Sequence, residues 1–334
     1  MNIVVFDADP WERDAFEPLA DHHELSITAD PLDEHTAAEH AGADVVSSFI
    51  YSSLTRDVLR QFDDLGLIAT RSTGVDHVDA GFCKQHHIAV SNVPSYGSNT
   101  VAEHTFTLLL AVARRLVDAV DRTRRGDFSP RGLRGFDLHG KTLGVVGAGD
   151  IGRHAARIGV GFGMDVLAFD IQQDEHAAEE IGFRYVSLDE LLKRSDVVTV
   201  HVPASDKTKG MIGQREFGLM RSHAVLINTA RGDVVEVEPL VDALAHGRIA
   251  GAGLDVLPQE PVIREEAELY RSIYEERNNL QKLLADHVLV NMPNVVVTPH
   301  SAFNTREAVE RILQTTVNNI TAFTKGDEPP DRVL

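Results

Sequence analysis

The chain has 334 residues, 43% of them hydrophobic and 25% charged, an ordinary composition for a globular protein of about two domains. Its formal net charge of -19 disfavours nucleic acid and anionic membranes as partners. The only cysteine, Cys83, excludes an intrachain disulfide and a metal site built on thiols, so we assign no metal ligands.

The sequence gives no sign of export or of membrane insertion. Its first residues lack the basic start and the small-residue cleavage site of a signal peptide. Its apolar runs stay below the roughly 18 residues that a membrane span needs. We therefore expect a cytoplasmic protein. The acidic, lysine-poor composition fits a salt-rich cytoplasm and, equally, simple compositional bias.

The first hundred residues predict a small α/β unit. Apolar, strand-like runs alternate with helical segments, and this alternation is typical of a mostly parallel sheet. The expected strands are 3–6, 45–50, 67–70 and 88–90, and the expected helices include 55–62 and 78–85. Loops rich in hydrogen-bond donors follow two of the strands, at 71–76 and 93–98. Open α/β sheets bind ligands at such loops, although either loop alone is also compatible with an ordinary turn.

A long helix is predicted over 100–120, because apolar residues recur there at helical spacing. This helix leads toward the next unit. The stretch 121–140 is polar and rich in arginine, and we expect it to wrap the surface.

A glycine motif then stands between two apolar runs. The run 143–146 meets G-x-G-x-x-G at Gly147, Gly149 and Gly152, and a helical pattern follows. Gly147 permits the tight turn, Gly149 lets backbone amides approach a pyrophosphate, and Gly152 lets helix and strand pack closely. The N-terminus of the helix adds free N–H groups and partial positive charge toward the phosphates. The motif therefore predicts a dinucleotide-binding fold.

An acid at the end of the next strand identifies the cofactor. The run 166–169 ends in Asp170, whose carboxylate would accept hydrogen bonds from the ribose hydroxyls and repel a 2′-phosphate. Residues 171–173 include no arginine that could attract such a phosphate, so we expect NAD rather than NADP. Asp150 places a carboxylate inside the phosphate turn, and we expect its side chain to point outward to solvent.

The alternation of strands and helices continues beyond Asp170. The expected strands are 197–202, 224–228, 252–256 and 295–298, and the expected helices are 188–195, 216–220, 237–246, 270–285 and 305–323. We expect the last helix to return to the first unit and pack on it. This organisation predicts a discontinuous substrate domain, 1–99 with 300–334, and a cofactor domain, 100–299, with a cleft between them.

Three ionisable residues follow strands of the cofactor domain: Arg231, Glu260 and His300. Reduction of a keto acid needs a cation that binds the carboxylate and polarises the carbonyl, and arginine does this with its forked donors. It also needs an acid for the new alkoxide, for which histidine is suited. A carboxylate beside the histidine keeps it protonated and oriented. Asp255 ends its strand where it would contact the nicotinamide carboxamide. Each of these residues, taken alone, is also compatible with an ordinary surface role.

At these residues the sequence resembles the D-isomer-specific 2-hydroxyacid dehydrogenases, over nearly the whole chain. The segments that carry the resemblance are 101–105, 147–152 with Asp170, 201–203, 228–232, 253–256, 260–261 and 298–303. Within the family the chain is most similar to the D-lactate dehydrogenases, in residues 300–305, 49–51 and 95–96.

The resemblance implies two Rossmann-like, doubly wound parallel-sheet domains: a flavodoxin-like catalytic domain that closes by a hinge motion, and an NAD-binding domain that forms a homodimer. It implies NAD-dependent reduction of a small 2-keto acid such as pyruvate to the D-2-hydroxy acid, and the reverse reaction. Arg231 would bind substrate, His300 would be the acid and base, and Glu260 would pair with His300. The implied substrate contacts are Tyr51, Thr73, Gly74, Tyr96 and Arg231. The implied cofactor contacts are Gly147, Gly149, Asp150, Ile151, Gly152, Asp170, His201, Val202, Pro203, Thr208, Thr229, Ala230, Arg231, Asp255 and His300.

Three alternatives remain open. The first is a dehydrogenase for a larger 2-hydroxy acid, such as 2-hydroxyisocaproate or phenyllactate, since the long interval 261–299 bears on the size of the substrate. The second is an NAD-sensing corepressor, which is disfavoured because the full catalytic set is present. The third is a formate or phosphite dehydrogenase, which is disfavoured because those substrates lack a keto group.

Overall fold

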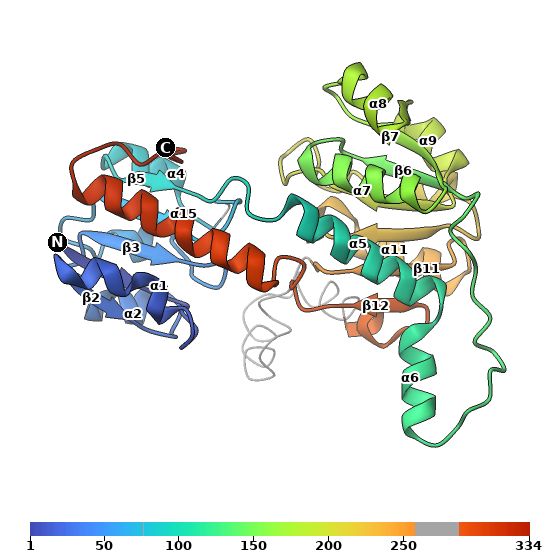
Figure 1. Cartoon of the computed structure of the whole chain (residues 1–334), viewed down its shortest axis with the longest axis horizontal. Helices are drawn as coiled ribbons and strands as arrows, with labels where there is room; N and C mark the ends of the chain where they lie inside the picture. The colour runs from blue at the N-terminus through green and yellow to red at the C-terminus, as the bar shows by residue number, and fades with distance from the viewer. Residues whose placement is uncertain (76, 258–286) are drawn as a thin grey trace. The chain divides into compact units, whose positions relative to one another are not determined.

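The computed structural model divides the chain into two compact units (Figure 1). Unit 1 comprises Met1–Tyr96 and Asn304–Leu334, and unit 2 comprises Gly97–Phe303. The structure describes the whole chain except residue 76 and residues 258–286. The predicted helix 270–285 lies outside the described residues. Each unit contains one parallel sheet, which confirms the predicted fold class.

The sheet of unit 1 has the strand order β2-β1-β3-β4-β5, and all of its pairings are parallel. Its strands are β1 (Asn2–Val5), β2 (Glu24–Ile27), β3 (Val45–Ser48), β4 (Leu67–Thr70) and β5 (Ala89–Ser91). The four strands expected from apolar runs are present. The edge strand β2 was missed because Glu24 is exposed and the rest of the strand is only half-buried, so the strand carries no apolar run.

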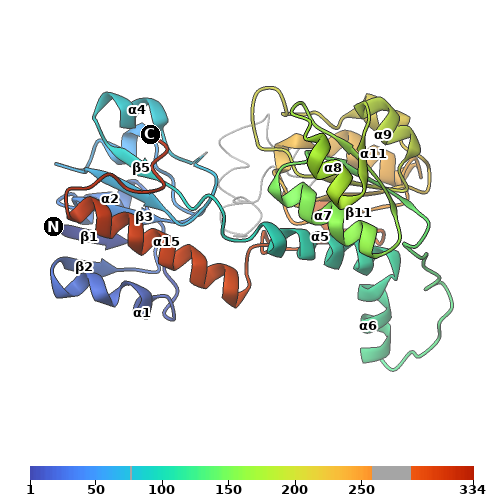
Figure 2. The same ribbon diagram turned by 45° about the horizontal axis from the view of Figure 1, so that its top comes forward.

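Helices cover the sheet of unit 1. They are α1 (Arg13–Phe16), the 3-10 helix η1 (Glu17–Asp21), α2 (Glu34–Glu39), α3 (Arg56–Leu59), α4 (Ala80–Gln85) and α15 (Arg306–Thr324). Helices α2, α3 and α4 contribute side chains to one buried core with β1, β3 and β4. The long C-terminal helix α15 packs against β4. It lies along the strands of unit 1 in both views (Figures 1 and 2). The last helix thus returns to unit 1 as predicted.

The sheet of unit 2 has the strand order β12-β11-β10-β9-β6-β7-β8, again entirely parallel. Its strands are β6 (Thr142–Val146), β7 (Asp165–Phe169), β8 (Phe183–Tyr185), β9 (Val197–Val200), β10 (Val225–Asn228), β11 (Gly251–Leu254) and β12 (Val295–Val297). The chain builds outward from β6 to β8 and then returns to β9 on the other side of β6. The strand order therefore reverses between β6 and β9, which is where doubly wound sheets bind nucleotides.

Both faces of this sheet are buried. Val145 belongs to one core and the next residue, Val146, belongs to the other, because successive side chains of a strand point to opposite faces. The helices of unit 2 are α5 (Ser98–Ala113), α6 (Leu116–Arg124), α7 (Asp150–Gly161), α8 (Glu175–Ile181), α9 (Leu188–Arg194), α10 (Gln214–Leu219), the 3-10 helix η2 (Gly232–Val234) and α11 (Val237–Ala245). Among the described residues, no helix combines the length and apolar character that a membrane crossing requires.

The prediction of a single helix over 100–120 is wrong, because the structure has two helices there. Helix α5 ends at Ala113, whose carbonyl accepts a hydrogen bond of 3.0 Å from the backbone N–H of Phe136. Gly135 packs so closely that a Cβ there would lie 2.0 Å from the same carbonyl oxygen. Arg115 then takes the left-handed conformation, with φ of 48°, and α6 begins after it. A contact from a distant segment therefore ends the helix, and helical periodicity cannot reveal it.

Candidate active site

The glycine turn lies between β6 and α7, at the point where the strand order reverses. Gly147 has φ of 96°, and a Cβ there would lie 2.8 Å from the backbone of His201. A Cβ on Gly152 would lie 1.9 Å from the carbonyl oxygen of Gly147. Gly149 faces open space, because no atom lies within 4 Å of its Cβ position. The turn therefore excludes side chains on two sides and stays open on the third, where a pyrophosphate would approach the backbone.

Asp170 is fixed beside this turn. One of its carboxylate oxygens accepts a hydrogen bond from the backbone N–H of Ala148 at 2.7 Å, and the other accepts one from that of Gln172 at 2.9 Å. A carboxylate has about four acceptor positions, so a partner with two hydroxyl groups also fits it. Asp150, at the start of α7, is exposed as expected. The open turn and the fixed carboxylate together fit NAD.

The segment after β9 closes the other side of the turn. The backbone N–H of His201 donates to the carbonyl oxygen of Val146 at 2.7 Å, and its Nε2 lies 2.9 Å from the hydroxyl of Thr199. The residue as a whole is partly buried, and burial lowers the pKa of His201 to about 4, so the ring is neutral at pH 7. The hydroxyl of Thr208 donates to the carbonyl oxygen of Pro203 at 2.6 Å and so tightens the following loop.

Arg231 lies in a loop that Asn228, the last residue of β10, holds in shape. The side-chain amide of Asn228 donates to the carbonyl oxygen of Arg231 at 3.0 Å and accepts from the backbone N–H of Ala230 at 3.0 Å. The hydroxyl of Thr229 lies 3.0 Å from that of Thr105 on α5. Arg231 itself is half-buried and donates to the carbonyl oxygen of Ala230 at 2.8 Å. The loop thus sets the position from which the guanidinium projects.

Asp255, directly after β11, holds the segment that carries His300. One carboxylate oxygen accepts hydrogen bonds from the hydroxyl of Thr298 at 2.5 Å and from the backbone N–H of Ser301 at 2.9 Å. The other oxygen accepts from the backbone N–H of Ala302 at 2.8 Å. His300 has φ of 50°, a left-handed conformation that is uncommon outside glycine and needs support from its surroundings. The buried carboxylate supplies this support on both sides of His300.

His104 of α5 completes the contacts of this carboxylate. Its Nε2 lies 3.3 Å from Asp255 and 3.0 Å from the hydroxyl of Thr298. Burial alone would raise the pKa of Asp255, but the hydrogen bonds from His104, Thr298 and the two backbone N–H groups outweigh it and lower that pKa. Asp255 is therefore ionised at neutral pH although it is only 1% exposed.

Unit 1 brings its predicted substrate residues to the carboxyl end of its own sheet. The loop after β4 is tied to the loop after β5, since Thr73 donates from its hydroxyl to Val93 at 2.7 Å and accepts at its carbonyl from Asn92 at 2.7 Å. The hydroxyl of Ser72 donates to the carbonyl oxygen of Gly74 at 2.7 Å.

The two predicted aromatic residues follow β3 and β5. Tyr51 is 48% exposed and meets the ring of Phe49 edge to face, with ring centroids 5.5 Å apart. The carbonyl oxygen of Tyr96 accepts a hydrogen bond of 2.5 Å from Arg311 on α15. Glu260 lies outside the described residues.

A sequence model of the D-isomer specific 2-hydroxyacid dehydrogenases, covering their NAD-binding domain, matches residues 106–302. The chain belongs to this family. It is therefore an NAD-dependent oxidoreductase of 2-hydroxy acids, as the resemblance predicted.

Proteins of this family with different names are similar to the chain over most of its length. A glyoxylate reductase of Thermococcus litoralis is 37% identical, over 87% of this chain and 83% of that enzyme. An aromatic 2-oxoacid reductase of Clostridium sporogenes is 33% identical, over 97% of this chain and 96% of that enzyme. The D-lactate dehydrogenase of Aquifex aeolicus, solved with NAD and lactic acid, is 37% identical, with a TM-score of 0.85 over 98% of this chain and 96% of that one.

Within this dehydrogenase the structure adds residues that sequence reasoning missed. The sequence assigns no role of their own to His104, in the segment 101–105, or to Thr298, in the segment 298–303, yet both contact Asp255. Asp255 was assigned to the nicotinamide carboxamide. That contact stays a prediction, because the structure places protein donors against both of its oxygens. No local signal identifies these partners, since strand and helix patterns do not report which distant segments meet.

The contacts of Asp255 predict the behaviour of Asp255→Asn. The substituted amide leaves a buried N–H without its acceptor, so we expect a loss of about 1–3 kcal/mol in the free energy of unfolding. Displacement of the His300 segment is expected to lower kcat for 2-oxo acid reduction about 100-fold. Urea unfolding and steady-state kinetics measure the two effects. As a control, Asp242→Asn removes an exposed carboxylate of the same unit and is expected to change neither quantity appreciably.

The pH dependence follows from the lowered pKa of Asp255. A carboxyl group with a lowered pKa in the folded state contributes stability that is full above its unfolded value of about 4 and is lost as pH falls through the folded value. The stability difference between wild type and Asp255→Asn should therefore be largest near pH 7 and shrink as pH falls from about 5 toward 3. A difference that stays constant over this range would contradict the assignment.

Proposed function

We propose that the protein reduces pyruvate to D-lactate with NADH and catalyses the reverse reaction with NAD. The observation that carries this proposal is the similarity, over nearly the whole chain, to a D-lactate dehydrogenase solved with NAD and lactic acid. The presence of Arg231 and His300 in the loops that follow β10 and β12 supports it, because these residue types supply the two functions that reduction of a 2-keto acid requires.

The roles follow from the chemistry of each group. Arg231 binds the substrate carboxylate and polarises its carbonyl group. His300 donates a proton to the oxygen of that carbonyl during reduction and accepts it during oxidation. Glu260 is assigned as the carboxylate that pairs with His300 and orients its imidazole, the role that the family resemblance implies. NADH, when bound, supplies the hydride.

Substrate binding is assigned to residues 1–99 with 300–334, and cofactor binding to residues 100–299. The backbone N–H groups around Thr73 and Gly74 provide further donors to the carboxylate, and the rings of Tyr51 and Tyr96 contact the methyl end of a small substrate. Asp170 binds the adenosine ribose. The glycine turn, 147–152, binds the pyrophosphate at the N-terminus of α7.

A second candidate substrate is a 2-oxo acid of different size. It is favoured by relatives of comparable identity that are named glyoxylate reductase and aromatic 2-oxoacid reductase. The panel of 2-oxo acids described next separates these candidates.

The function is tested by NADH oxidation with pyruvate, glyoxylate, 2-ketoisocaproate and phenylpyruvate. We expect the highest kcat/KM for pyruvate, and in the reverse direction oxidation of D-lactate but not of L-lactate. A higher kcat/KM for glyoxylate or phenylpyruvate would reassign the substrate within the family. Comparable rates with both lactate enantiomers would reject the assigned stereochemistry.

The role of His300 is tested best by His300→Asn. Asparagine tolerates the left-handed conformation of this residue, whereas alanine adds backbone strain. We expect kcat to fall by roughly 10²–10⁴-fold, the usual contribution of general acid catalysis, while the Kd for NADH changes less than about threefold. His246→Asn, at an exposed position after α11, is the matched control and should keep the wild-type rate. Equal turnover by wild type and His300→Asn would remove His300 from the mechanism.

We also propose a homodimer formed through the NAD-binding domain. Helix α6 has no buried residue, and it projects from the rest of unit 2 (Figure 1). Leu116, Val117 and Val120 on this helix are 53%, 52% and 38% exposed, and Phe128 in the following segment is 80% exposed. A contiguous exposed apolar patch on a folded protein commonly marks a partner surface.

The double variant Leu116→Asp/Val120→Asp tests this interface, because the two side chains lie one turn apart on the same face of α6. We expect a monomer in sedimentation velocity, where wild type sediments as a dimer. Arg124→Ala on the same helix should leave the dimer intact. A monomeric wild type would refute the proposal.

A cytoplasmic location stays a proposal that rests on the single cysteine, and fractionation of the source cells checks it.

A further inference from the structure

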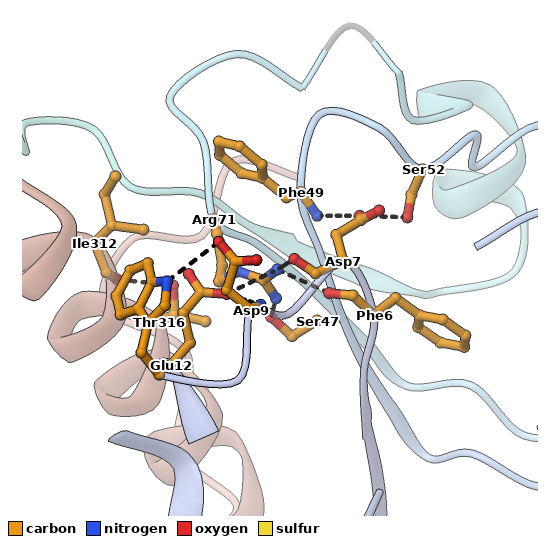
Figure 3. Close-up of polar contacts among 11 residues, drawn as sticks. Phe6, Asp7, Asp9, Glu12, Ser47, Phe49, Ser52, Arg71, Ile312 and Thr316 are labelled. Atoms are coloured by element: carbon orange, nitrogen blue, oxygen red, sulfur yellow. Dashed lines mark hydrogen bonds and ion pairs between the residues drawn. The ribbon is translucent and has the colours of Figure 1, made fainter. Parts of the chain in front are cut away.

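A fully buried arginine lies at the carboxyl end of the sheet of unit 1 (Figure 3). Arg71 directly follows β4 and is 1% exposed. Its guanidinium donates to the carbonyl oxygens of Phe6 at 2.7 Å and Asp7 at 2.8 Å, and to the hydroxyl of Ser47 at 3.3 Å. A carboxylate oxygen of Glu12 lies 3.9 Å from the same group. One side chain thus connects the ends of β1, β3 and β4.

Asp7 extends these connections to the loop after β3. One of its carboxylate oxygens accepts hydrogen bonds from the backbone N–H of Phe49 at 2.8 Å and from the hydroxyl of Ser52 at 2.6 Å (Figure 3). Asp7 has φ of 54°, a left-handed conformation that turns its side chain toward this loop. Because the guanidinium of Arg71 binds the carbonyl group of Asp7, it stabilises this uncommon conformation.

The guanidinium of Arg71 also contacts the aromatic rings of Phe49 and Phe16. Its central carbon lies 5.9 Å from the ring centroid of Phe49 and 6.0 Å from that of Phe16, within the range of a cation–π contact. Phe49 in turn meets Tyr51 edge to face. The position of Tyr51 therefore depends on Arg71 both through Asp7 and through the ring of Phe49.

Arg71 is also the residue next to the loop 72–74. Its backbone N–H donates to the carbonyl oxygen of Ser48 at 2.8 Å, which fixes the start of this loop against the end of β3. The loop after β4 and the loop after β3 are consequently held by one residue.

Burying the charges of Arg71, Asp7 and Glu12 costs free energy, so a contribution to stability alone does not account for the cluster. Burial lowers the pKa of Arg71 and raises the pKa of Asp7 and of Glu12. The positive charge of Arg71 opposes the rise at both carboxyl groups. Replacing buried ion clusters by apolar residues is often neutral or stabilising in proteins. Here the charged group makes directional contacts with backbone carbonyl groups, which an apolar side chain cannot make. The cluster is thus suited to fixing loop geometry.

We propose that Arg71 and Asp7 are positioning residues that fix the two substrate loops of unit 1, residues 49–52 and 72–74, and so set KM and the preference for a small 2-oxo acid without touching it. This inference rests on the proposed function, in which Tyr51, Thr73 and Gly74 contact the substrate.

Asp7→Gly is the informative variant, since glycine keeps the left-handed backbone and removes the carboxylate. We expect KM for pyruvate to rise at least tenfold, while kcat and the Kd for NADH change less than about threefold. The ratio of kcat/KM between 2-ketoisocaproate and pyruvate should also rise, because Tyr51 is no longer fixed. Asp7→Asn keeps an acceptor and tolerates the same φ, so it should restore KM to within about threefold of wild type.

Asp44→Ala is the matched control for stability. Asp44 also accepts a backbone N–H, from Asn2 at 2.7 Å, but it precedes β3 and so lies at the opposite end of the same sheet. We expect this variant to unfold at a lower temperature with KM unchanged. If Asp44→Ala raises KM as much as Asp7→Gly does, the effect is general destabilisation and the proposal is overturned.

Hydrogen exchange read by mass spectrometry tests the same link without activity. In Asp7→Gly the amide of Phe49 loses its acceptor, so peptides that cover 49–52 should exchange at least tenfold faster, and those that cover the core of β1 should not change. Unchanged exchange at 49–52, or an unchanged KM in an active enzyme, overturns the proposal. Faster exchange in Asp7→Gly, together with no turnover of any of the 2-oxo acids by wild type, would instead overturn the proposed function. The dependence of loop 49–52 on Asp7 would still hold. Arg71→Met is not used, because it would leave the buried carboxylates of Asp7 and Glu12 without their cation and is expected to destabilise unit 1.

Discussion

The buried carboxylate of Asp255 is the interaction on which the proposed chemistry depends. The hydrogen bonds of a parallel sheet stop where the strands end, so a segment beyond β12 has no ladder partner to fix it. Asp255 takes the place of such a partner by accepting from Thr298, Ser301 and Ala302. His300 lies between these anchor points in a left-handed conformation. The position of the proposed acid and base is thus set by a side chain directly after the neighbouring strand β11.

The same device recurs at two other places where function is proposed. Asp170 follows β7 and accepts the N–H of Ala148, which follows the neighbouring strand β6. Asp7 follows β1 and accepts the N–H of Phe49, which follows the neighbouring strand β3. In each case a carboxylate after one strand binds a backbone N–H after the adjacent strand. The sheet positions strand ends to within a few ångströms, and these carboxylates fix the loops beyond them.

The sequence revealed the parts of this structure that depend on nearby residues. The glycine motif and Asp170 lie within one strand–helix–strand unit, and the hydrogen bond that joins them spans 22 residues. The contact of Asp255 with Thr298 spans 43 residues, and that of Arg71 with Asp7 spans 64. Nothing in strand or helix periodicity reports such contacts. The break between α5 and α6 was missed for the same reason, since a distant backbone donor contacts the end of α5. The edge strand β2 was missed for another reason, because its exposure leaves it without an apolar run.

Backbone N–H groups satisfy the carboxylates at these loops, in a protein whose formal net charge is -19. A carboxylate that is satisfied by backbone N–H groups needs no arginine to stay ionised, as the lowered pKa of Asp255 illustrates. Arg71 differs, since its guanidinium binds backbone carbonyl groups rather than a single carboxylate. Its charge is therefore held below the loop surface, where it orders the backbone, and the proposed binding of the substrate carboxylate is assigned to Arg231.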